Sequence, residues 1–246
     1  MGTERCKKVV YVQPYWRQDG SCRRGWRGRR LAEGLGNGFC SRRPQLRFLH
    51  VFGGTGVWRR ERRNRLQELR DAHRLVGGTG RGRRWRTTQL DAALLVRLAV
   101  EFQGFGRDLH DLASTEFAQR AAISNRQLEE TIRTALVQGR QLDRQNAHPG
   151  SLGSDFNRLG MDVWSALEQL DPETPRHNVA LDSLNTLRNA LVHDQTGKLE
   201  ELEKVGMRIT LRTYVGLLKP LDQLAGNLDC VVADHLGQLF GKQPPW

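Results

Sequence analysis

This sequence has few cysteines, and their spacing suits no common metal site. Its 246 residues include four cysteines, Cys6, Cys22, Cys40 and Cys230, and no two of them form a C-x-x-C pair. The first three are 16 and 18 residues apart, which matches no usual zinc spacing. The sequence therefore predicts scattered reduced thiols, no metal site and no cofactor.

Long apolar runs are also missing. No stretch approaches the roughly 20 apolar residues that a membrane-spanning helix needs. The charged N-terminal residues are not followed by the apolar core of about 7–15 residues that marks a signal peptide. These absences predict a cytoplasmic protein that does not cross a membrane.

Positive charge is abundant but unevenly placed. Residues 1–86 hold 23 Lys and Arg against 6 Asp and Glu, a net charge of +17. Residues 87–246 hold 16 against 21, a net charge of −5, so the whole chain carries +12. The basic excess therefore belongs to an arginine-rich leader that can attract phosphates. The charge of the remaining, mildly acidic part does not by itself indicate nucleic-acid binding.

The leader, residues 1–58, is predicted to be poorly structured. Gly and Arg interrupt each of its apolar runs, so it cannot bury enough surface to offset the entropy of ordering. We expect either a flexible basic arm or a stretch added by a start codon assigned too far upstream. The pattern G-G-T-G-x-x-R-R occurs at residues 53–60 and again at 77–84. Such turns can cradle phosphate through backbone N–H groups, so Arg83 and Arg84 are candidate RNA contacts, with chance similarity as the alternative.

From residue 60 onward, apolar side chains recur with the helical period. This pattern predicts an all-α fold, a five- to six-helix bundle that occupies residues 59–242. We expect a capping box at Ser124 and a helix cap at Ser154, and a kink at Pro220. The expected helices cover about residues 60–76, 88–112, 124–143, 154–171, 177–193 and 210–240.

The fifth expected helix ends in a polar cluster. Asn189 and His193 lie one turn apart, almost opposite the leucine stripe, with Asn185 in the same polar row and Arg188 at the edge of the stripe. An asparagine one turn before a histidine can hold the ring in one orientation, and a guanidinium binds phosphate bidentately. An imidazole that moves a proton and an arginine that stabilises the phosphorane can cut RNA without metal. The alternative is an ordinary solvated helix end, where the helix dipole favours histidine.

The stretch R-N-x-x-x-H, from Arg188 to His193, resembles the signature of the HEPN superfamily (higher eukaryotes and prokaryotes nucleotide-binding). The resemblance covers roughly residues 60–242, and the stretch VEFQGFGRDLHD is similar to the first long helix of actinobacterial HEPN-like proteins. It implies a metal-independent endoribonuclease of the toxin–antitoxin or antiphage defence type. It also implies a homodimer whose two motifs face one cleft. In this resemblance Arg188 and His193 are catalytic and Asn189 positions them.

One position departs from the family pattern. HEPN toxins paired with a nucleotidyltransferase antitoxin carry a tyrosine two residues after the histidine, and Gln195 stands there in this chain. The departure weakens the expectation of an antitoxin of that kind.

A second polar cluster is expected on the long helix. Gln103, Arg107 and His110 share the face opposite its apolar stripe. This face is either solvated, or it borders the same cleft so that Arg107 and His110 help to hold RNA.

Two rival functions stay open. The first is a catalytically silent HEPN-like module that binds a nucleotide or a partner protein in the same cleft. The second is a purely structural helical protein in which Arg188 and His193 only cap and pair locally.

Overall fold

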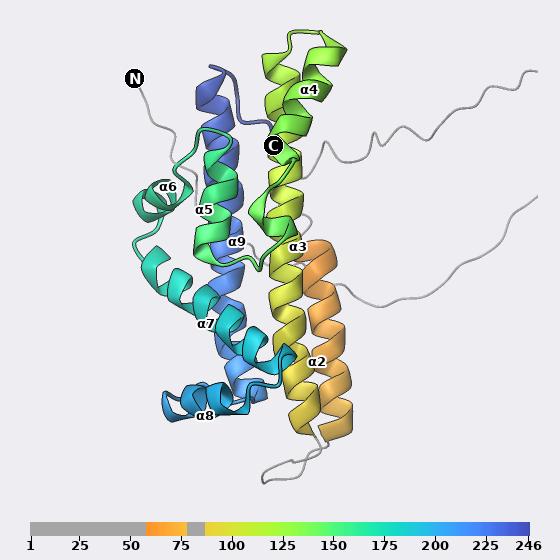
Figure 1. The fold of residues 1–246 in the computed structure, drawn as a ribbon, viewed down its shortest axis with the longest axis vertical. Coiled ribbons are helices and arrows are strands. Elements are labelled where there is room, and N and C mark those ends of the chain that lie inside the picture. Colours follow the sequence, from red (N-terminus) through yellow and green to blue (C-terminus); the bar gives the residue numbers. More distant parts are fainter. Residues whose placement is uncertain (1–57, 78–86) are drawn as a thin grey trace, which may run out of the picture. The chain divides into compact units, whose positions relative to one another are not determined.

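Residues 58–77 and 87–246 are the part of the chain that the computed structural model describes, and they fold into helices (Figure 1). No strand occurs in these two ranges, so the predicted all-α fold is confirmed for them. The expected leader, except Trp58, and both Arg83 and Arg84 lie outside the described residues. The helical elements are η1 (Trp58–Arg62, a π-helical turn), α2 (Arg63–Gly77), α3 (Thr88–Ala121), α4 (Arg126–Val137), η3 (Gln141–Asp143, a 3₁₀ turn), α5 (Pro149–Asn157), α6 (Val163–Leu170), α7 (Thr174–Val192), α8 (Thr196–Lys204) and α9 (Leu211–Leu239).

Helices α3 and α9 form the centre of this bundle. They are the longest of the described helices and pack along each other, and α7 contacts both. Helices α2 and α4 contact α3, and α6 contacts α9 (Figure 1). One connected apolar core includes Phe102 from α3, Leu184 from α7 and Leu228 from α9, all fully buried. This packing holds α7 against the two central helices and so fixes the place of the predicted site.

Helix α3 is buried on more than one face. Its apolar stripe, with Leu98 and Phe105, lies in the core, as the helical period predicts. On other faces Glu101 and His110 are also buried, with exposed fractions of 1% and 0%. The reason is that α2 covers one flank of α3, while α4, η3 and α5 cover another. The expectation of a solvated polar face is therefore wrong for this helix.

The boundary expected between residues 58 and 59 lies too late, because Trp58 belongs to the core. This side chain is 1% exposed. Its ring meets Phe102 and Phe105 edge-on, each at a centroid distance of 5.7 Å. Its indole N–H donates to the Asp222 carboxylate of α9 at 2.9 Å. Buried tryptophan usually finds such a partner for its N–H, and here the bond ties η1 to α9.

The predicted caps Ser124 and Ser154 are wrong. Ser124 is left-handed, with φ 67°, and Asn125 caps α4 in its place by accepting the Leu128 N–H at 3.1 Å. Helix α4 ends at Val137, short of the predicted end near residue 143. Gly139 follows it with φ 76°, a conformation that ends helices and that glycine adopts without strain.

The predicted fourth helix is two helices in the structure. His148 caps the first, α5, because its ring nitrogen Nδ1 accepts the Ser151 N–H at 3.3 Å. Gly160, with φ 74°, separates α5 from α6. Helix α8 was not predicted from the sequence. None of its residues is buried, and its sequence has no apolar stripe of the kind that marks the other helices. Helix α9 continues as one helix through Pro220.

Candidate functional site

The candidate site lies where α7 ends. The backbone N–H of His193 donates to the Asn189 carbonyl at 3.1 Å, the last turn of the helix. Asp194 then adopts a left-handed conformation with φ 47°, which aspartate tolerates better than most residues. The N–H of Gln195 reaches back to the Ala190 carbonyl at 2.9 Å, the long hydrogen bond of a Schellman cap. This turn fixes the backbone of His193 and leaves its side chain exposed.

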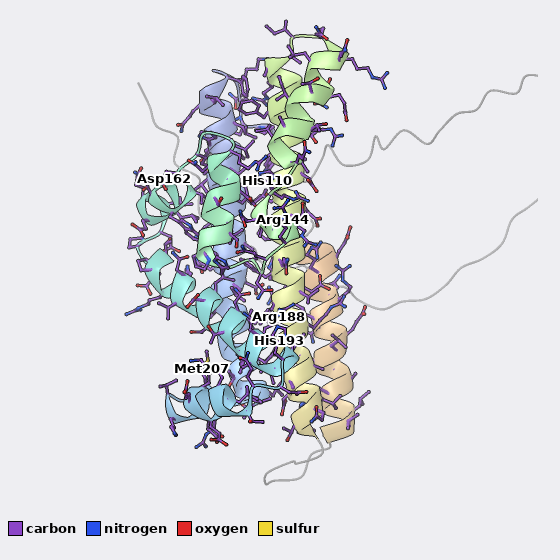
Figure 2. The ribbon with its side chains drawn as sticks, in the orientation of Figure 1. His110, Arg144, Asp162, Arg188, His193 and Met207 are labelled. Atoms are coloured by element: carbon purple, nitrogen blue, oxygen red, sulfur yellow. The ribbon has the colours of Figure 1, made fainter. Side chains whose placement is uncertain are left out.

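Arg188 and His193 therefore share one helix end (Figure 2). His193 is the one exposed histidine in the described ranges. Arg188 is half-buried, and its Nη1 donates to Asn189 Oδ1 at 2.9 Å. Within the described residues no carboxylate pairs with Arg188 and this is its one hydrogen bond. A guanidinium has five N–H donors, so most of those on Arg188 are open to a ligand.

The expectation that Asn189 orients the His193 ring is wrong. The Asn189 side-chain oxygen accepts from Arg188 and also from Asn146 Nδ2, the latter at 2.7 Å. Over the described part of the chain, no hydrogen bond joins the Asn189 amide to the His193 ring. Asn189 therefore acts on the guanidinium rather than on the imidazole.

Asn146 is a residue of this site that the sequence analysis did not find. It lies in the connecting loop, residues 138–148, which joins α4 to α5 and contains η3. It stands 43 positions before Asn189 in the chain. Nothing in its neighbourhood, a polar loop before His148 and Pro149, distinguishes it from any turn asparagine. Only the tertiary fold brings the two amides together.

Asn185, one turn before Asn189, holds the same loop. Its side chain is buried, and its Nδ2 donates to the Ala147 carbonyl at 3.0 Å and to the Leu181 carbonyl at 2.9 Å. The polar row predicted on α7 is therefore real, but two of its members are directed at the connecting loop.

The second predicted cluster meets the other side of that loop. Arg107 Nε donates to the Leu142 carbonyl at 2.7 Å and lies 3.4 Å from the Asp143 carboxylate. Gln103 Nε2 donates to the same carbonyl at 2.9 Å and to the Gln145 carbonyl at 2.8 Å. Arg107 keeps part of its side chain exposed. These two residues of α3 thus hold the segment that carries Asn146.

His110 is not a surface residue, contrary to its expected role in RNA contact. Its Nε2 lies 3.0 Å from the Asp155 carbonyl, and its Nδ1 lies 3.3 Å from the Ser114 hydroxyl. A carbonyl can only accept, so Nε2 carries the proton and Nδ1 accepts from the hydroxyl. Burial lowers the pKa of His110, which keeps the ring neutral. The ring also meets Phe156 edge-on at 5.6 Å, so His110 is a core histidine that joins α3 to α5.

Asp155 of α5 completes the loop's attachment. Its side chain is 1% exposed. One carboxylate oxygen accepts the Gln141 N–H at 2.7 Å and the other accepts the Leu142 N–H at 2.8 Å. Backbone N–H groups that would otherwise be buried without a partner are satisfied in this way. The connecting loop is therefore fixed by side chains from α3, α5 and α7.

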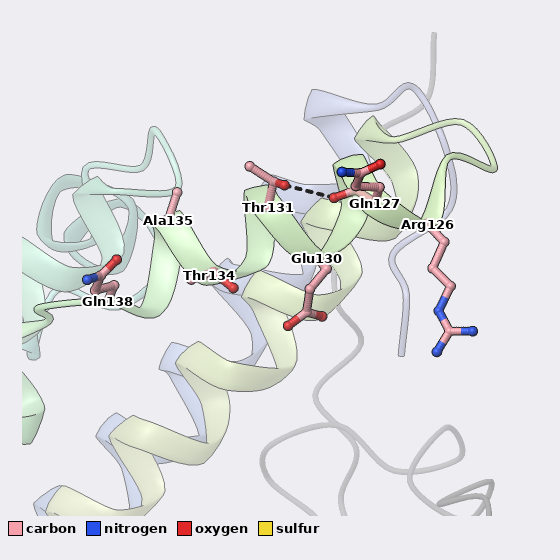
Figure 3. Close-up of a pocket in the computed structure, with 7 residues that line it drawn as sticks. All are labelled: Arg126, Gln127, Glu130, Thr131, Thr134, Ala135 and Gln138. Carbon is pink, nitrogen blue, oxygen red and sulfur yellow. Dashed lines mark hydrogen bonds between the residues drawn. The ribbon is translucent and has the colours of Figure 1, made fainter.

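Two surface hollows lie away from this site. The first, of about 770 Å³, runs along α4 (Figure 3). Two of its lining residues share a local hydrogen bond, from the Thr131 hydroxyl to the Gln127 carbonyl at 2.8 Å. The second, of about 560 Å³, lies between the start of α3, α8 and the segment before α9. Neither is lined by Arg188, Asn189 or His193, so the candidate site is a surface cluster outside both hollows.

Two further properties bear on the site. In residues 58–77 and 87–246, no three or more His, Cys, Asp or Glu side chains are grouped so that they could hold a metal ion. None of the helices there combines the length and the apolar character needed to cross a membrane.

Comparison of the chain with models of protein families, with curated proteins and with solved structures finds no match.

Proposed function

We propose that this chain is a metal-independent endoribonuclease of HEPN type, with Arg188 on the phosphate and His193 in proton transfer. One observation supports it most. A half-buried arginine without an acidic partner in the described residues lies five positions before an exposed histidine, about one and a half turns along the same helix end. A charge held in place by a neutral amide keeps its full attraction for an incoming phosphate.

The chemistry that these groups offer is transesterification. His193 takes the proton of a ribose 2′-hydroxyl, whose oxygen attacks the adjacent phosphorus. Arg188 stabilises the negative charge that develops on the phosphorane, and the 5′-oxygen leaves with a proton donated by a second imidazole. The products are a 2′,3′-cyclic phosphate and a 5′-hydroxyl end. One chain supplies one exposed imidazole in its described part, whereas the reaction gains from both a base and an acid. A homodimer would bring in the second.

A second candidate is favoured by one specific observation. Within the described residues the His193 ring has no hydrogen-bond partner that fixes its orientation or tautomer, although a catalytic imidazole usually has one. A catalytically silent module that binds the phosphate of a nucleotide through Arg188 needs no oriented imidazole. Both candidate functions use Arg188 to bind a phosphate, but only the ribonuclease needs the His193 side chain.

Incubation with a mixed pool of single-stranded RNA distinguishes them. We expect cleavage by the wild-type chain, also in EDTA, with 2′,3′-cyclic phosphate ends. His193→Ala should lower the rate by roughly 10²–10⁴, the usual contribution of general acid–base catalysis. Arg188→Ala should lower it by a comparable factor through loss of charge at the phosphorane. Both variants should fold, because neither side chain is in the buried core.

Two matched variants serve as controls. Arg176→Ala removes an exposed arginine from the other end of α7, where it pairs with Glu173. Gln195→Ala changes an exposed residue two positions after His193. Both should cut as the wild type does. Equal rates in all five proteins would identify the activity as a contaminant. Phosphate or nucleotide binding that depends on Arg188, without any cleavage, would instead support the silent module.

A further inference from the structure

The hydrogen bond between Asn146 of the connecting loop and Asn189 of α7 extends the site. We propose that Asn146 is a positioning residue, which acts through Asn189 to hold the Arg188 guanidinium. Its catalytic consequence depends on the ribonuclease function proposed above, while its effect on Arg188 does not.

The orientation of the two amides follows from a group that can only donate. Arginine carries five N–H donors and no acceptor, so the atom of Asn189 that faces Arg188 Nη1 at 2.9 Å must be the oxygen. The same oxygen lies 2.7 Å from Asn146. Asn146 must therefore present its NH₂ group to it. The donor-only guanidinium thus fixes the orientation of both amides.

The loop keeps Asn146 in place without help from Asn189. Asn185 binds the carbonyl of Ala147, the next residue, at 3.0 Å. Gln103 binds the carbonyl of Gln145, the preceding residue, at 2.8 Å. Hydrogen bonds from two different helices thus hold both neighbours of Asn146. The Asn146 side chain is a fixed donor from outside α7, against which the Asn189 amide is set.

Loss of that donor should act on Arg188. Without the Asn146 NH₂ group, a single bond to Arg188 holds the Asn189 oxygen among the described residues, and the pair can turn together. A guanidinium that samples several positions loses much of its advantage in binding one phosphate geometry. An aspartate at position 146 should be worse than an alanine, because its carboxylate would attract Arg188 away from the phosphate.

The experiment compares Asn146→Ala and Asn146→Asp with Gln145→Ala in the full-length chain. Gln145 is the matched control, since its side chain is exposed and its bond to Gln103 uses the backbone carbonyl. Its side-chain Oε1 lies 3.2 Å from His148 Nε2 and forms no hydrogen bond with Asn189 or Arg188. Single-turnover cleavage of one RNA strand should slow about tenfold in Asn146→Ala, the change for one lost hydrogen bond. It should slow further in Asn146→Asp and stay at the wild-type rate in Gln145→Ala. Melting temperatures of the three variants should lie within about 4 °C of the wild type.

A double-mutant cycle separates positioning from any independent role. If Asn146 acts through Asn189, the double variant with both alanines should be no slower than Asn189→Ala alone. Multiplied rate effects, as expected of two independent contributions, would overturn the proposal. So would a wild-type rate in Asn146→Asp, since the isosteric side chain lacks the N–H donor and adds a negative charge.

A measurement that does not depend on catalysis tests the positioning of Arg188 even if the chain does not cut RNA. The ¹⁵N relaxation of the Arg188 Nε–H group reports how tightly the guanidinium is held. The Arg188 guanidinium should be ordered in the wild type and in Gln145→Ala, and mobile in Asn146→Ala. Mobility of Arg188 in Asn146→Ala together with an inactive wild type would support Asn146 as the positioner of Arg188 and contradict the ribonuclease function. Unchanged order of Arg188 in Asn146→Ala would overturn the positioning itself.

Discussion

Glu101 is a buried carboxylate surrounded by guanidinium groups in the contact between α2 and α3. It accepts hydrogen bonds from Arg62 at 2.9 Å, from Arg65 at 2.8 and 2.9 Å, and from Arg97 at 2.8 Å. Burial alone would raise the pKa of Glu101, but the hydrogen bonds and charges of Arg65 and Arg97 outweigh it and lower the pKa to about 2. The folded state therefore keeps this carboxylate charged well into the acid range.

Replacement of Glu101 by glutamine should lower the free energy of unfolding at pH 7 by roughly 3 kcal/mol, because it leaves several guanidinium groups without their shared counter-charge. The loss should depend on pH. The unfolded chain takes up the proton near 4.5, the ordinary pKa of a glutamate, and the folded chain near 2. The Glu101 carboxylate thus makes its full contribution to the free energy of unfolding above pH 4.5, and this contribution is lost as the pH falls toward 2.

Urea unfolding of the wild type and Glu101→Gln between about pH 7 and about pH 2.5 checks this prediction. The difference in free energy of unfolding between the wild type and Glu101→Gln should be constant above about pH 5 and should become smaller below it. Glu130→Gln is the control, since Glu130 is exposed and pairs with Arg133 on the surface of α4. The loss of stability in Glu130→Gln should be much smaller than in Glu101→Gln, because solvent screens an exposed ion pair. A difference for Glu101→Gln that does not change with pH would contradict the low pKa.

The sequence predicted which side chains lie near one another only within a single helix. The i, i+4 rule correctly placed Asn185, Asn189 and His193 at one end of one helix, and the structure keeps them there. The partners of the two asparagines could not be predicted, because Asn146 and Ala147 come from a loop about 40 residues earlier in the chain. His110 shows the same limit, since its burial depends on α5 and not on its own helix.

The sequence predicted a helix correctly where apolar residues recur with the helical period over many turns. The stripes of α3 and α9 identify both, and the predicted start of α9 at Thr210 agrees with its capping side chain, which accepts the Thr213 N–H at 3.2 Å. The shorter helices were less predictable. The break at Gly160 depends on a left-handed φ of 74° that a single glycine in an otherwise helical pattern does not announce.

The contribution of the η1 turn to the stability of the fold can be tested by a substitution at Trp58. Trp58→Ala should lower the free energy of unfolding by roughly 3–5 kcal/mol, the usual cost of removing a large buried aromatic side chain. The reason is that this side chain is 1% exposed and packs against two phenylalanines of α3. Differential scanning calorimetry of the full chain measures the loss.

Trp58→Phe separates packing from hydrogen bonding in the same measurement. It keeps an aromatic ring and removes the N–H that donates to Asp222, which retains its ion pair with Arg63 at 2.8 Å. Its cost should be clearly smaller, near the roughly 1 kcal/mol of one hydrogen bond plus a small cavity. Wild-type stability of Trp58→Ala would mean that η1 contributes nothing to the fold and that the domain begins later.

At the scale of the whole molecule, the proposed chemistry gains from two imidazoles in one site, which leads to the prediction of a dimer through the end of α7. Val192 is 48% exposed and precedes His193. It lies four residues after Arg188, hence on the same face of the helix. If two copies of the motif face each other, this side chain lies in their contact.

Val192→Glu should therefore convert the chain to a monomer at tens of micromolar, because two like charges would meet across the two-fold axis. The RNA cleavage rate should fall with it. Val179→Glu is the matched control: the same substitution on the same helix, at a valine that is 66% exposed and 13 residues away from Val192. It should leave both the mass and the rate unchanged. Light scattering at several concentrations gives the mass. A wild type that is monomeric at tens of micromolar yet cuts RNA would mean that one imidazole is sufficient, since each active particle would then contain a single His193.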